Sequence, residues 1–192
     1  MKKLIMALGA ALVFAAGSAF AGDSALTADT AKRFVASLPS VETLAESLEA
    51  EGRVEEMRFD TEPKAGEEFK PYSKAVMALK AKYPSDYGKL SSAVKPHGFT
   101  AEEWGVAGDK VMIAYMALKM DKEDPGAMAQ MEAMDPAMLE MMPPEMKAQM
   151  ERVKAMMATI AAASPEDKKA VAEVEDELDA YMDEQGAGQS TY

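Results

Sequence analysis

Methionine is the residue type with the most distinctive chemistry in this sequence. Eleven of its 18 methionines fall between residues 120 and 157. Four of these follow one another at spacings of three and four residues: Met128, Met131, Met134 and Met138. Such spacings place side chains on one side of a helix, and thioether sulfurs are soft ligands that select Cu(I) over hard cations. The pattern therefore allows a Cu(I) site, and no other cofactor is indicated.

The same methionines allow two other interpretations. Methionine is unbranched and adaptable, so it fills irregular cores, and it also serves on apolar surfaces that repack around different partners. Apolar residues spaced three and four apart ordinarily form the side of a helix that packs against a core. Prolines interrupt the segment and indicate short, adjustable elements, so we expect a contact surface for an apolar protein or peptide partner. Its methionines are Met128, Met131, Met134, Met138, Met141 and Met142.

Residues for catalysis are scarce. The chain has no Cys and one His, His97, whereas a zinc site needs three or four ligands. The motifs of serine hydrolases, phosphate-binding loops and zinc proteases are absent from the sequence. We expect His97 to stabilise its turn and the end of the helix before it. The sequence therefore predicts a protein that is not an enzyme.

The charge of the chain excludes two classes of partner. Acidic residues number 33 against 21 Lys and Arg, and the net charge is −12. Nucleic-acid backbones and anionic lipid headgroups are bound by clustered Lys and Arg, so binding to either is not expected. The chain is 48% hydrophobic, which is enough to bury a core and argues against a disordered protein.

The first 21 residues have the pattern of a signal peptide. Lys2 and Lys3 precede the apolar run 4–16, and residues 19–21 form the small-x-small sequence that signal peptidase reads. Cleavage after Ala21 would leave a soluble, exported protein. No later segment is long and apolar enough for stable insertion in a membrane, so we expect a periplasmic protein.

Residues that cap or break helices divide the remaining chain into expected helices. We expect one helical domain over 22–185, with the Met-rich segment 120–157 inside it, and a flexible tail over 186–192. Pro39 predicts the end of a first helix, and Ser40 the cap of a second one. Further expected helices cover 71–83, 85–94, 101–120, a short stretch from Pro136, 144–163 and 164–186.

The helix at 101–120 carries the clearest signals. Thr100 and Glu103 form a capping box at its start, and apolar residues occupy most of its circumference, which is typical of a helix buried on most sides. The helix at 144–163 carries one apolar stripe, for which we expect packing against the domain: Met146, Met150, Val153 and Met157. The sequence therefore predicts an all-α fold, a single compact bundle of six or seven helices around residues 101–120.

Two stretches carry a resemblance to other proteins. Residues 33–41, and His97-Gly98-Phe99 followed by Glu102-Glu103-Trp104, resemble a group of small exported all-helical proteins of Gram-negative bacteria without an assigned activity. The resemblance implies export and a helical fold, and no site residue is carried over from it. Residues 26–30 are also similar to the Leu-Thr-x-x-Gln motif of periplasmic stress chaperones, although the Gln is missing here.

These observations lead to one expected function with two alternatives. We expect an exported, non-enzymatic binding protein that presents a Met-rich helical surface to apolar partners or peptides. The first alternative is a periplasmic protein that binds Cu(I) or another soft metal through Met128, Met131, Met134 and Met138. The second is a purely structural protein whose methionines fill its core.

Overall fold

The computed structural model describes residues 25–53, 57, 59–64, 67–123, 125–126 and 142–189. Within these ranges the chain forms helices and turns and no β-strand. The elements are α1 (Ala28–Ala50), α2 (Pro71–Lys82), α3 (Pro84–Val94), the 3-10 turn η2 (Lys95–His97), α4 (Ala101–Glu123), α7 (Pro144–Ala161), α8 (Pro165–Ala172) and α9 (Glu175–Gln189). The prediction of an all-α bundle is confirmed. The expected signal peptide, residues 1–21, lies outside the described residues.

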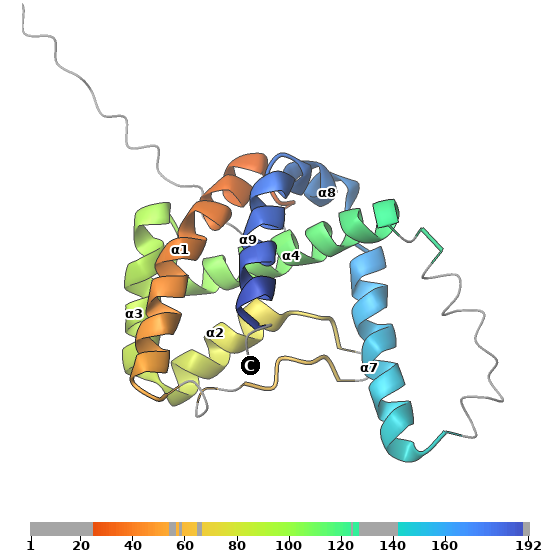
Figure 1. Ribbon diagram of the computed structural model, residues 1–192, viewed down its shortest axis with the longest axis horizontal. Helices are drawn as coiled ribbons and strands as arrows, with labels where there is room; N and C mark the ends of the chain where they lie inside the picture. The colour runs from red at the N-terminus through yellow and green to blue at the C-terminus, as the bar shows by residue number, and fades with distance from the viewer. Residues whose placement is uncertain are drawn as a thin grey trace, which may run out of the picture.

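Helix α4 is the centre of the bundle, as its sequence predicts. The capping box forms in full, because Glu103 N donates to Thr100 Oγ1 at 3.2 Å and Thr100 N donates to Glu103 Oε2 at 2.8 Å. From there α4 crosses the molecule and packs against α1, α2, α3, α7 and α8 (Figure 1). Ala107, Val111 and Ala114 along it are fully buried.

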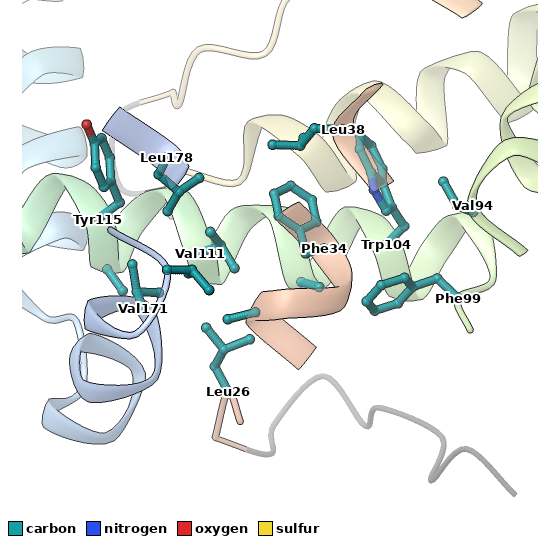
Figure 2. Close-up of a cluster of buried hydrophobic side chains, with 14 of the residues drawn as sticks. Leu26, Phe34, Leu38, Val94, Phe99, Trp104, Val111, Tyr115, Val171 and Leu178 are labelled. Atoms are coloured by element: carbon teal, nitrogen blue, oxygen red, sulfur yellow. The ribbon is translucent and has the colours of Figure 1, made fainter. Parts of the chain in front are cut away.

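The core is one cluster of side chains along α4, with an aromatic part and an aliphatic part (Figure 2). Over the first half of the helix, the rings of Phe34 and Tyr72 lie 5.4 and 5.5 Å from the ring of Trp104. Over the second half, Val171 of α8 and Leu178 of α9 pack against Val111 and Tyr115. The aromatic half joins α4 to α1 and α2, and the aliphatic half joins it to the C-terminal helices.

Two glycines of α4 allow α2 to approach closely. A Cβ atom at Gly108 would lie 2.8 Å from the ring of Tyr72 and 2.9 Å from the ring of Phe34. A Cβ atom at Gly105 would lie 3.2 Å from the Cα atom of Ser73. Larger residues at either position would push α2 away from α4, so these glycines set the distance between the two helices.

The prediction that Pro39 ends a helix is wrong. Helix α1 continues through Pro39 as far as Ala50, although proline removes one helical hydrogen bond. Phe34 and Leu38 before the proline and Leu48 after it are all buried. Packing on both sides of the proline therefore holds the helix together and outweighs the local penalty.

The last expected helix, 164–186, is divided in two. Ser164 caps α8 as expected, since its Oγ accepts from Asp167 N at 3.0 Å. The chain then turns at Glu173 and Val174, where Val174 N donates to Val171 O at 2.9 Å, and α9 takes a new direction (Figure 1). Helix α9 also continues past the expected end at Gly186 to Gln189. The apolar spacing continues across the turn, so it gave no sign of the break.

Candidate functional site

Helix α7 is the least buried long helix of the bundle. Pro144 occupies its first turn, as expected, and Ile160 near its end is its only buried residue. Met146 is 51% exposed and Val153 is 39% exposed. The predicted packing stripe is therefore wrong for Met146 and Val153, whereas Met150 and Met157 are half-buried.

Polar contacts join α7 to the chain segment that leads into α2. Thr159 Oγ1 accepts from Phe69 N at 3.2 Å, and Arg152 donates to Glu62. Both partners belong to the stretch that leads into α2, and Figure 1 shows this stretch reaching across to α7 at the edge of the bundle. Ile160 supplies the buried apolar contact. A helix held in this way has little of the apolar burial that gives a core helix its local stability.

Most of the predicted methionine site lies outside the described residues. This holds for Met128, Met131, Met134, Met138 and Met141. Met142 is described, and it lies half-buried just before α7. The Met-rich contact surface and the alternative Cu(I) ligands therefore stay predictions, while the exposed stripe of α7 continues the same methionine pattern in the described part of the chain.

His97 lies at the junction between α1 and η2. Its Nε2 atom is 3.4 Å from Ser40 Oγ, and Arg33 donates to the backbone oxygen atoms of His97 and Gly98. The Arg33 guanidinium also lies 4.8 Å from the centre of the Phe99 ring. Serine catalysis by a histidine usually depends on a carboxylate that orients the imidazole, whereas Ser40 is the side-chain partner of His97 here. The contacts join two elements of the scaffold.

A cavity of about 650 Å³ lies between α4 and the connection from α7 to α8. One face of α4 forms its floor, through residues spaced as i, i+3, i+4, i+7 and i+8: Val106, Asp109, Lys110, Ile113 and Ala114. Thr159 and the small residues 162–164 close it from the α7–α8 side, and Asp167 lines it from α8. Its volume is in the range of small-molecule sites.

Asp109 is the buried charged group of this cavity. It is 4% exposed, and its two carboxylate oxygens accept from Tyr72 N at 2.7 Å and Ser73 N at 3.2 Å. These are free amides at the start of α2, so Asp109 does the work of a capping residue from another helix. Burial is the main cause that raises the pKa of Asp109 above its usual value, against the lowering effect of these hydrogen bonds.

Sequence reasoning missed this cavity. The available signal was a single acid, Asp109, inside the most apolar helix of the chain, since such a group must find hydrogen-bond donors when it is buried. A second sign was the run of small residues 162–164, which cannot fill the space beside α4. Neither sign identifies the two elements that meet, because residue 109 and residue 162 are far apart in the sequence.

Some kinds of site find no support in the described part of the chain. There, no group of three or more His, Cys, Asp and Glu side chains is arranged to hold a metal ion. None of the helices in the same ranges has both the length and the apolarity needed to cross a membrane. Comparison of the chain with models of known protein families, with curated proteins and with solved structures gives no match.

Proposed function

We propose that this chain is an exported, non-enzymatic binding protein, and that α7 with the Met-rich segment before it forms a contact surface for an apolar segment of another polypeptide. The observation that carries the proposal is the open stripe of α7. Met146 and Val153 are both exposed by more than a third, on a helix of which Ile160 is the only buried residue.

The stripe suits a helical partner. Met146, Met150, Val153 and Met157 recur at spacings of three and four residues, which matches the anchors of an amphipathic helix laid along a groove or helix face. Methionine side chains adapt to different partner shapes. Exposed apolar residues gathered on one helix side are also costly for a protein that works alone, and they often mark interaction sites.

Charge defines the partner further. The chain carries a net charge of −12, so long-range attraction favours partners with Lys or Arg beside their apolar residues. We therefore expect an amphipathic, basic segment. The signal-peptide pattern of residues 1–21 supports export to the periplasm as part of the same proposal.

Methionine methyl resonances provide the test. The chain is labelled with [methyl-¹³C]methionine and titrated with a synthetic amphipathic helical peptide of Leu and Lys. We expect the signals of Met146 and Met150 to shift with saturation. The matched control is Met77 of α2, which is 67% exposed but lies outside the stripe. Its signal should stay in place.

Variants complete the experiment. The double change Met146→Glu and Val153→Glu should abolish the saturable binding, because it places charge in the apolar contact. Met77→Glu adds one acid elsewhere on the surface and should leave binding intact. Shifts of equal size at Met77 and Met146, or binding that survives the double change, would overturn the proposal.

A further inference from the structure

We propose that the partner of the α7 stripe is a helix that packs as in a coiled coil, and that acidic residues at the edge of its apolar seam pair with Lys147 and Lys154. This inference deepens the proposed function and rests on it, because the contact is the same stripe. It adds the register of the contact and the charges that lie beside it.

The stripe of α7 follows the heptad spacing of a coiled coil. Four residues, separated by four, three and four positions, take the heptad positions d, a, d and a: Met146, Met150, Val153 and Met157. Apolar residues at a and d form the seam that one helix of a coiled coil presents to the next. A matching partner therefore carries apolar residues at its own a and d positions.

The stripe is open where α7 projects from the bundle. The exposed fraction of the residues at d falls along the helix, from 51% at Met146 to 39% at Val153 and 4% at Ile160. Figure 1 shows the end of α7 that contains Ile160 close to α4, whereas the end that begins at Pro144 projects away from α4. A partner helix on the projecting turns would continue the apolar contact that begins at Ile160.

Two lysines lie along one edge of this stripe. Lys147 and Lys154 each follow a residue at d, Met146 and Val153, so they occupy the e positions of the two heptads. One residue turns the helix by about 100°, which places both lysines on the same edge. Residues at e and g form the ion pairs between helices that determine which partner binds.

Lys147 and Lys154 form no ion pair with any acid in the part of the chain that the structure describes. Glu151 is an exposed acid between them in the sequence, but it lies further round the helix from the stripe than either lysine. Glu67 and Glu68 line a groove together with Lys154, and their carboxylates pair with lysines at the start of α2. The edge of the stripe therefore offers two positive charges to a partner.

The charges of the partner follow from these positions. The other edge of the stripe is uncharged, because Gln149 and Met156 hold the g positions. An acid beside the partner's seam would be attracted by Lys147 and Lys154, while a lysine there would meet like charge. The net charge of −12 still favours a partner that is basic overall. We therefore expect Lys on the outer face of the partner helix and Glu or Asp beside its seam.

Two peptides of identical composition test this arrangement. Both contain about three heptads with Leu at a and d, and like charges at e and g keep either peptide from pairing with itself. The first peptide has Glu at e and g and Lys at b, c and f. The second has Lys at e, g and f and Glu at b and c. Because e and g carry the same residue, the comparison holds for either direction of the bound helix.

Each peptide is titrated into the full chain labelled with ¹³C in its methionine methyl groups. We expect both peptides to shift the signals of Met146 and Met150 with saturation. The first should bind about tenfold more tightly than the second, as expected for two exposed ion pairs gained and two like-charge contacts avoided.

Charge reversal on α7 provides the second half of the test. Lys147→Glu with Lys154→Glu should reverse the preference, so that the second peptide becomes the tighter ligand. The control, Lys95→Glu with Lys169→Glu, makes the same change of net charge at exposed positions of η2 and α8. It should leave the preference for the first peptide intact. Circular dichroism measures the helix content of each variant.

Failure of this inference is distinguishable from failure of the proposed function. Equal affinity of the two peptides for the unchanged chain would overturn the edge contacts and leave the apolar surface standing. A preference that survives Lys147→Glu with Lys154→Glu would do the same. Titrations in which neither peptide gives saturable shifts at Met146 would overturn both proposals.

Discussion

The indole N–H of Trp104 donates a 2.8 Å hydrogen bond to Ser37 Oγ, across the interface between α4 and α1. Ser37 Oγ in turn donates to Phe34 O at 2.6 Å. Both side chains are buried, and a buried polar group without a partner costs more than an ordinary hydrogen bond contributes. The serine hydroxyl therefore serves two groups at once and joins the two helices at their most aromatic point.

Removal of this hydroxyl should be costly. We expect Ser37→Ala to lower the free energy of unfolding by about 1–3 kcal/mol, because the indole N–H loses its acceptor inside the core. Ser47→Ala is the matched control, since Ser47 is exposed on the same helix. Urea denaturation followed by circular dichroism measures both. Equal stability of the two variants would show that the hydrogen bond contributes nothing.

Two glycine substitutions should act in opposite directions. Gly108→Ala places a methyl group 2.8 Å from the Tyr72 ring and should destabilise the protein by about 1–3 kcal/mol through overpacking. Gly88 in α3 has no atom within 4 Å of an added Cβ. Gly88→Ala should stabilise the protein by about 0.5–1 kcal/mol, as expected inside a helix. Thermal unfolding compares the signs directly, and a stabilising Gly108→Ala would contradict the close approach of α2 to α4.

The stability of the protein should depend on Glu102 in acid. Its carboxylate accepts from Lys80 Nζ at 2.5 Å and from Tyr87 OH at 2.7 Å, and these contacts lower its pKa to about 2. Because the folded pKa lies below the unfolded one, this contribution is present at neutral pH and is lost as the pH falls from about 4.5 to about 2. Glu102→Gln should flatten the stability curve in this window.

The control for that experiment is Glu46→Gln, which removes an exposed acid from α1. Urea midpoints collected across the acid range give the curve for each protein. If Glu102→Gln and the unchanged protein lose stability in parallel between pH 4.5 and pH 2, the contact with Lys80 does not lower the pKa of this group.

Replacement of Pro39 should make the protein more stable. It is exposed and interrupts the hydrogen bonds of a helix that tertiary packing keeps continuous. Pro39→Ala restores an amide donor and a favourable helix residue, so we expect stabilisation by about 1–3 kcal/mol. A rise in melting temperature is the measurement. A fall would mean that the proline itself is needed for the packing of Leu38 and Leu48.

Helix α7 should exchange its amide hydrogens faster than α4. One buried residue, Ile160, anchors it, whereas ten residues of α4 between Ala101 and Ala117 are buried, and exchange by local opening follows this difference. Hydrogen exchange with mass spectrometry measures both helices in one sample. Ile160→Ala should speed exchange in α7 and leave α4 unchanged; protection of α7 equal to that of α4 would contradict the weak attachment.

Local signals predicted the framework of this fold. The capping box at Thr100 and Glu103 satisfies free amides within one turn, so its residues alone indicate where α4 begins. The continuous α1 was not predictable in the same way, because the penalty at Pro39 is local while the compensation comes from burial of Phe34, Leu38 and Leu48 in the bundle. Helix propensity gives no information about such distant packing.

The candidate sites were less predictable for a related reason. Spacing shows that Met146, Met150 and Val153 share one side of a helix, but it does not show whether another element covers that side. The cavity needs Asp109 and Ala162 to meet across the fold, and no periodic pattern relates them. Burial and long-range contact are properties of the assembled bundle, so they could be assigned only from the structure.

The position of Trp104 determines which part of this protein its fluorescence reports on. It is the single tryptophan of the chain, and the rings of Phe34 and Tyr72 lie within 5.5 Å of it. Its emission therefore reports on the junction of α1, α2 and α4. Helix α7 contains no fluorophore, so its detachment from the bundle would leave the emission spectrum of Trp104 unchanged. An unchanged emission spectrum is therefore evidence about the core alone.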